Sequence, residues 1–140
     1  MRRYLVVANR TLGGDHLIDA LQERIGQGPC TIHVLVPASH TSSGAFWTEG
    51  EAMAHAREQL DHAVARFRGL GLEVTGEVGD ASPMRAVGDV LLHDTFDEII
   101  LSTLPPGPSR WLRQDVVHRL QRGVDVPVTH VVAAEQPATA

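Results

Sequence analysis

The residues best placed to do chemistry surround a helix start that follows a proline-rich loop. Three prolines stiffen the loop 102–109, and the helix expected after it carries Arg110 and Arg113 in its first turn. A helix start offers unpaired N–H groups and the positive end of the helix dipole, which two arginines reinforce. This combination predicts binding of a small anion; alternatively, the two arginines pair with Asp94 or Asp115.

Further candidate ligand-binding residues lie in the loops that follow the other expected strands. In an open parallel sheet these loops meet at the carboxyl edge, where such folds bind their ligands. The loop 37–48 is long for a strand-to-helix connection, which is typical of a lid or a mobile insertion. Its aromatic pair, Phe46 and Trp47, could close over a ligand or cap the sheet edge. The candidate ligand-binding residues are Asn9, Trp47, Asp80, Ser102, Thr103, Ser109 and Arg110.

Other groups of reactive residues lack the partners that catalysis or metal binding needs. His55, Glu58 and His62 have helical spacing, but an ordinary solvated helix face explains them, and we predict no metal site. The single cysteine, Cys30, has no evident histidine base beside it, and no serine has a nucleophile-elbow pattern. The sequence therefore predicts no catalytic residue and no cofactor, with a nucleotide kept as a candidate ligand.

Length and composition favour one globular domain. The chain has 140 residues, of which 43% are hydrophobic and 21% charged, values close to those of ordinary globular domains. Acidic residues outnumber basic ones by 17 to 12, which argues against broad binding to nucleic acid or anionic membranes. No apolar run approaches the roughly 18 residues of a membrane helix, and no signal-peptide region is evident. With one cysteine, these features predict a cytoplasmic protein without a nucleic-acid or membrane partner.

Hydrophobic patterning predicts five strands alternating with four helices. Short apolar runs mark strands covered on both faces, and apolar stripes with a helical period mark the helices. Strands are expected over 4–8, 31–36, 72–78, 96–101 and 127–133, and helices near 17–25, 49–67, 83–94 and 109–122. The residues of the second helix expected to face the core are Met53, Ala56, Leu60, Val64 and Phe67.

This alternation predicts the fold class. Strands that alternate with helices form a mainly parallel sheet with right-handed crossovers. We therefore expect an α/β protein with a single open, mainly parallel five-stranded sheet and four helices on both faces. One domain should span 1–134, followed by a flexible tail over 135–140.

The order of elements and several motifs resemble the universal stress protein family, and the resemblance covers nearly the whole chain. The segment Gly79-Asp80-Ala81-Ser82-Pro83 is similar to the family's glycine-acidic-proline turn before its third helix. Segments 97–101 and 126–132 are similar to its fourth and fifth strands. The resemblance implies a Rossmann-like fold, a role in the stress response and a homodimer formed through the last strand.

The pattern with which nucleotide-binding members of that family hold ATP is absent. Those members carry glycine, two residues, glycine, nine residues, then glycine followed by serine or threonine. The matching positions here are Ser102, Pro105, Asp115 and Val116, and Asn9 replaces an aspartate of the ATP-binding members. Glycine lets backbone N–H groups approach phosphate, whereas proline has no N–H and a carboxylate repels phosphate. The resemblance therefore implies a small regulatory or ligand-binding module that does not bind ATP in the family's usual way.

Two other functions stay open at this point. The chain could be a homodimeric protein-interaction module with a degenerate ligand site, whose partner surface is the proline loop together with the loop 37–48. It could also be a weak nucleotide hydrolase, although no general base is obvious in the sequence.

Overall fold

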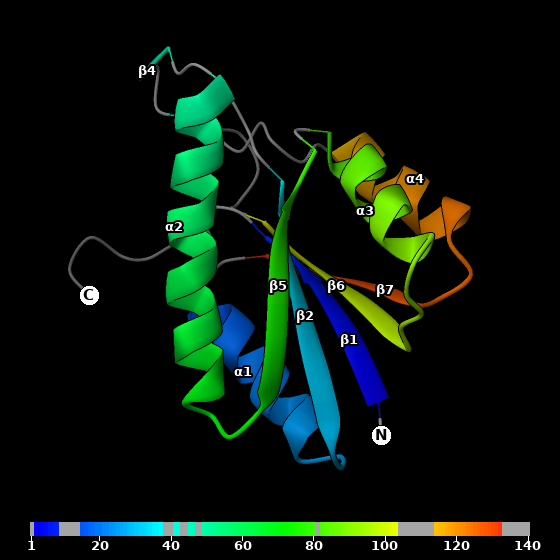
Figure 1. Ribbon diagram of the computed structural model, residues 1–140. Helices are drawn as coiled ribbons and strands as arrows, with labels where there is room; N and C mark the ends of the chain where they lie inside the picture. The colour runs from blue at the N-terminus through cyan, green and yellow to red at the C-terminus, as the bar shows by residue number, and fades with distance from the viewer. Residues whose placement is uncertain are drawn as a thin grey trace, which may run out of the picture.

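In a computed structural model of the chain, a parallel sheet is covered by helices on both faces (Figure 1). The structure describes residues 2–8, 15–37, 41–42, 45–46, 49–80, 82–103 and 114–132. The helices are α1 (Asp15–Ile25), α2 (Glu49–Arg68), α3 (Pro83–Leu91) and α4 (Gln114–Gly123). The strands are β1 (Arg2–Val7), β2 (Cys30–Pro37), β3 (Thr41–Ser42), β4 (Ala45–Phe46), β5 (Glu73–Gly79), β6 (Glu98–Thr103) and β7 (Val128–Val132).

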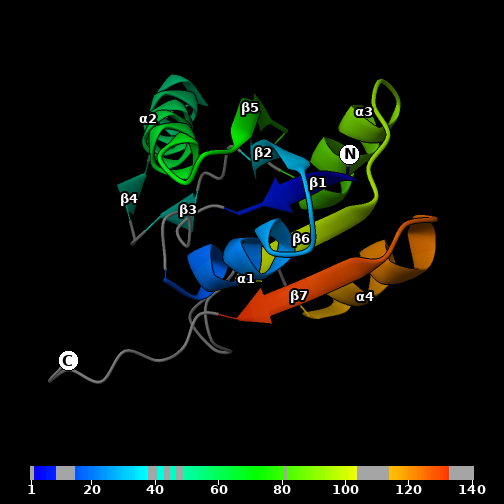
Figure 2. The ribbon, with the colours of Figure 1, turned by 90° about the horizontal axis from the view of Figure 1, so that it is seen from below.

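The main sheet has five parallel strands in the order β5-β2-β1-β6-β7. Central β1 pairs in parallel with β2 on one side and with β6 on the other. Seen from below, α1 and α2 lie on one face of the sheet, and α3 and α4 lie on the other (Figure 2). The predicted fold class is therefore confirmed, whereas the predicted tail over 135–140 lies outside the described residues.

Each face of the sheet has its own apolar core. Alternate residues of β1 point to opposite faces, so Tyr4 and Val6 pack under α1 and α2 while Leu5 and Val7 pack under α3 and α4. The inward stripe of α2 comprises Ala56, Leu60, Ala63 and Phe67, with Val64 partly buried beside it. Ile99 and Leu101 of β6 and Leu120 of α4 complete the core on the α3 and α4 face. Ile100 of β6 lies in the core on the opposite face.

The expectation that Met53 faces the core was wrong, since 44% of it is exposed. The reason is length: the 20 residues of α2 rise about 30 Å, whereas the seven residues of β5 extend only about 23 Å. The first turns of α2 therefore continue beyond the sheet that would bury them (Figure 1). None of the helices in the described parts of the chain combines the length and the apolar character that crossing a membrane requires.

Two boundaries also differ from the sequence-based prediction. Within the loop 37–48, β3 and β4 form a short antiparallel hairpin that pairs Thr41 with Phe46, an element that the sequence analysis missed. Phe96 was expected to begin a strand, but β6 starts two residues later. Phe96 is instead buried. Its ring stacks on the ring of His33, with 6.0 Å between the two centroids, and the guanidinium of Arg3 also lies over it.

Replacing Tyr4 with phenylalanine should leave stability unchanged or raise it. Tyr4 is 1% exposed, and its hydroxyl has no hydrogen-bond partner among the described residues. A buried, unsatisfied polar group costs about 1–3 kcal/mol, so removing it while keeping the ring relieves a penalty. Urea denaturation of the two proteins measures the effect. A loss of more than 1 kcal/mol, taken as a rough threshold, would show that the hydroxyl does have a partner.

Candidate functional site

A histidine and a serine from distant parts of the chain meet at the carboxyl edge of the sheet. Nε2 of His16, the second residue of α1, lies 2.8 Å from Oγ of Ser102 on β6, a hydrogen-bond distance. Ser102 is completely buried, and His16 is half-buried. An imidazole and a hydroxyl together can donate or accept a hydrogen bond toward a ligand group, and the imidazole can also carry a proton.

The alternation of β6 explains why Ser102 points toward α1. Ile99 and Leu101 face α3 and α4, and Ile100 faces α1 and α2, so the next even position continues on the α1 side. The chain order supplies the rest, because α1 follows β1 and begins at the carboxyl edge. Since β1 and β6 are neighbours at which the strand order reverses, the pair lies at the switch point where open α/β sheets bind ligands.

Asp80 is not part of this pair. It follows β5, three strands away from β6, a separation of roughly 14 Å at the usual strand spacing. Its Oδ1 accepts a hydrogen bond from the backbone N–H of Ser82 at 2.8 Å, and Ser82 in turn caps α3 as predicted. Asp80 therefore shapes the turn into α3, and its role in a ligand site stays a prediction.

Of the other predicted ligand-binding residues, one lies in the described part of the chain. Thr103 is the last residue of β6, directly after Ser102. Those that lie outside the described residues are Asn9, Trp47, Ser109 and Arg110.

His16 is the residue that the sequence analysis missed. The histidines are scattered along the chain, and none belongs to a recognisable motif. One signal was available: His16 lies at the start of α1, the helix that follows β1 and begins at the edge that borders the switch point. The contact with Ser102 spans 86 positions, which spacing along the chain cannot reveal.

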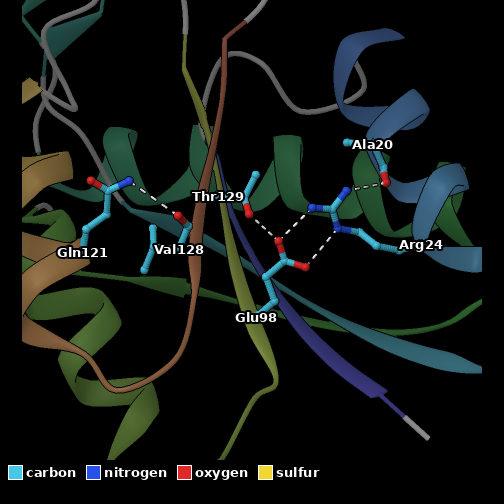
Figure 3. A network of polar contacts seen from close by, with 6 residues as sticks. All are labelled: Ala20, Arg24, Glu98, Gln121, Val128 and Thr129. Atoms are coloured by element: carbon cyan, nitrogen blue, oxygen red, sulfur yellow. Dashed lines mark hydrogen bonds and ion pairs between the residues drawn. The ribbon is translucent and has the colours of Figure 1, made fainter. Parts of the chain in front are cut away.

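A second polar cluster lies at the opposite, amino end of the sheet (Figure 3). Nε and Nη2 of Arg24 on α1 donate to the two carboxylate oxygens of Glu98 on β6, at 3.1 and 2.7 Å. Arg24 also donates through Nη1 to the carbonyl oxygen of Ala20, at 3.0 Å. The hydroxyl of Thr129 on β7 donates to the same Glu98 oxygen that receives Nη2. One carboxylate thus joins a helix and two strands.

The charge state of this cluster follows from its contacts. Burial alone raises the pKa of the Glu98 carboxyl, but hydrogen bonds from Arg24 and Thr129 outweigh burial and leave that pKa below its ordinary value. The hydrogen bond to Glu98 raises the pKa of Arg24. Both side chains are therefore charged at neutral pH, with about one sixth of each exposed: 14% for Arg24 and 17% for Glu98.

A cavity of about 170 Å³ opens beside this cluster, lined by Arg2, Arg24, Gln27, Gly28 and Pro29. Two arginines would favour an anion, but the guanidinium of Arg24 is already neutralised by Glu98. The cavity also lies at the carboxyl end of α1, where the helix dipole is negative. The electrostatics therefore assign this end of the sheet a structural role.

Four other reactive side chains are hydrogen-bonded or partly buried. Nε2 of His55 accepts a hydrogen bond from Nε2 of Gln59 at 2.8 Å. The described residues hold no group of three side chains suited to a metal ion. Burial raises the pKa of the Cys30 thiol, which disfavours the reactive thiolate. His33 lies 2.7 Å from the hydroxyl of Thr75, and burial lowers the pKa of His130. None of these groups assembles a second site within the described chain.

Comparisons with known proteins agree with this architecture. No family model and no curated protein matches the sequence. Among solved structures, the chain is similar to a universal stress protein from Archaeoglobus fulgidus, with a TM-score of 0.60 and 17% sequence identity. The match covers 94% of this chain and 98% of that chain. The strand order, the helices on both faces and a match that covers nearly all of both chains show that the chain has the fold of a universal stress protein.

Proposed function

We propose that this protein is a non-catalytic, universal-stress-protein-like regulatory module that binds a small anionic ligand at the switch point between β1 and β6. The observation that carries the proposal is the hydrogen bond between His16 and Ser102 at that edge. Burying a serine hydroxyl is costly unless it is paired, so this contact maintains a polar position at the mouth of an otherwise apolar sheet.

Ligand charge follows from the groups around the switch point. His16 lies in the first turn of α1, where the helix dipole adds positive potential. A protonated imidazole strengthens that potential. A phosphate or carboxylate group is therefore the ligand class that these residues favour, and a nucleotide is one candidate carrier of it.

The proposal excludes ATP binding of the family's usual kind and also excludes catalysis. Proline and aspartate occupy positions 105 and 115, where the nucleotide-binding relatives carry glycine. The hydroxyl of Ser102 is paired with the imidazole of His16, but its complete burial keeps it from attacking a substrate. We therefore propose binding and signalling, in the cytoplasm and in a stress response, as the function.

A thermal-shift screen tests the ligand site. Wild-type protein is melted with ATP, ADP, AMP, cyclic AMP and inorganic phosphate. A compound at 100 times its dissociation constant should raise the free energy of unfolding by about 2.7 kcal/mol. We expect His16→Ala to abolish the shift, because the variant removes the imidazole at the switch point. We expect the control His62→Ala to retain the shift, because His62 is exposed on α2.

Each outcome of this screen is informative. A thermal shift retained in His16→Ala would show that the ligand binds elsewhere than at the switch point. No shift with any compound would instead favour a protein-interaction module, and ATP turnover by the wild-type protein would revive the hydrolase alternative.

We also propose that the protein forms a homodimer through β7. The sheet has two edges: β5 presents Glu73 and Glu77, whereas β7 contains no charged residue other than a titratable histidine. Acidic side chains on an edge strand discourage pairing, so β7 is the edge suited to a second copy. Light scattering should give about twice the 15.2 kDa chain mass, and amides of β7 should exchange faster on dilution. A monomer at all concentrations would overturn this assignment.

A further inference from the structure

We infer that the His16–Ser102 pair is energetically coupled to the edge strand β7. The link runs from Thr129 through Glu98 and Arg24 into α1. This inference rests on the proposed function in treating the His16–Ser102 pair as the ligand site and β7 as the edge that pairs with a second copy.

The first step is that α1 is fastened to β6 at both of its ends. His16 contacts Ser102 near the start of the helix, and Arg24 contacts Glu98 in its last turn. Eight residues of helix rise about 12 Å, and the four residues of strand between the two contacts extend about 13 Å. The two elements therefore match in length, and a shift of the helix at one end must disturb the contact at the other.

The second step is that the contact between Arg24 and Glu98 is shared with β7. Oε2 of Glu98 receives both Nη2 of Arg24 and the hydroxyl of Thr129 (Figure 3). Because the carboxylate is held from two sides, a change in the position or pairing of β7 alters the geometry offered to Arg24. Hydrogen-bonded networks of this kind couple their members more strongly than separate pairs.

The consequence is a means of regulating the switch-point site from the edge of the sheet. A strand that pairs with β7, which we expect to be that of a second copy, would change the hold of Glu98 on Arg24. The rigid helix would pass this change to His16. Pairing of β7 would thereby change the affinity of the His16–Ser102 pair for its ligand by some factor. By linkage, a bound ligand would change the affinity of β7 for its partner by the same factor.

Nuclear magnetic resonance of the ligand-free protein tests this inference. The ¹⁵N resonances of the His16 imidazole report its hydrogen bond and its tautomer. We expect Thr129→Val and Glu98→Gln to shift these resonances, because the first removes one contact of the shared carboxylate and the second removes its charge. The matched control is Asp94→Asn, which removes the 3.1 Å ion pair with Arg3 and touches neither α1 nor β7.

A double variant separates α1 from a direct route along the sheet. Thr129 is aligned with Ile100 in the β6–β7 ladder, so a change at Thr129 could also reach Ser102 through the strands. An Arg24→Met background leaves the strands intact but removes the contact between α1 and Glu98. Adding Thr129→Val to that background should therefore produce no further shift of the His16 resonances.

The unfolding equilibrium gives a second readout. In a double-variant cycle, Thr129→Val and His16→Ala should deviate from additivity by more than about twofold in the unfolding constant, beyond the usual margin for independent sites. Asp94→Asn and His16→Ala should be additive. Coupling is overturned if Thr129→Val and Glu98→Gln move the His16 resonances no more than Asp94→Asn does. A shift that persists in the Arg24→Met background would overturn the route through α1. Neither result depends on whether a ligand binds.

Discussion

Replacing Glu98 with alanine is expected to lower the free energy of unfolding by about 3 kcal/mol, the low end of the range for breaking a buried ion pair. The carboxylate receives two hydrogen bonds from Arg24 and one from Thr129. Its removal leaves the largely buried guanidinium of Arg24 without its counter-charge. It also removes a contact that α1, β6 and β7 share.

Chemical denaturation at neutral pH measures this effect, and a surface ion pair supplies the matched control. Arg3 and Asp94 lie 3.1 Å apart, but 43% of each side chain is exposed. Asp94→Ala should therefore cost only about 0.2–1 kcal/mol, the range for exposed pairs. Equal losses in the two variants would contradict a special role of Glu98 in holding the fold.

The contribution of Glu98 should also depend on pH with a defined sign. The folded-state pKa of its carboxyl is lowered, so the folded state favours the ionised form. Its stabilisation is complete above the ordinary carboxyl pKa of about 4.3 and is lost as the pH falls through the lowered folded value. The stability difference between wild type and Glu98→Gln should therefore shrink in acid. A difference that grows below about pH 4 would contradict this assignment.

Replacing Gly76 with alanine is expected to destabilise the protein by about 2 kcal/mol through overpacking. A Cβ atom at this position of β5 would lie 2.5 Å from Cδ1 of Leu60 and 3.3 Å from Cγ2 of Val64, both on α2. It would also lie 3.2 Å from the carbonyl oxygen of Val34. The close approach of α2 to the sheet therefore depends on the missing side chain.

The same substitution in α3 should have the opposite sign. A Cβ at Gly88 meets nothing within 4 Å, and the residue lies in the interior of a helix. Gly88→Ala should stabilise the protein by about 0.5–1 kcal/mol, because alanine is the better helix former. Urea denaturation of both variants checks the pair of predictions.

The overpacking explanation can be isolated with Leu60. If the clash with Leu60 causes the loss at Gly76, Gly76→Ala should cost less in a Leu60→Ala background than in the wild type. An equal cost in both backgrounds would attribute the loss to the strand backbone instead.

Local patterns were enough to predict most elements, because their causes lie close together in the chain. The apolar spacing of Ala56, Leu60 and Phe67 placed one face of α2 in the core, and Ser82 before Pro83 marked the start of α3. Met53 continued the same spacing yet is exposed, since burial also depends on how far the neighbouring strand extends. The β3–β4 hairpin was missed because two-residue strands leave no hydrophobic period.

The amino-acid sequence alone determined the fold class of this protein, because alternating apolar runs and stripes dictate a parallel sheet with helices on both faces. That a ligand binds at the carboxyl edge of this sheet stays a prediction. Only the tertiary structure decided which side chains meet there and what holds them. His16 and Ser102 are 86 positions apart, and Arg24 and Glu98 are 74 apart. Such contacts depend on strand order and on the matched lengths of a helix and a strand. These properties arise from packing between elements and leave no periodic trace within any one of them.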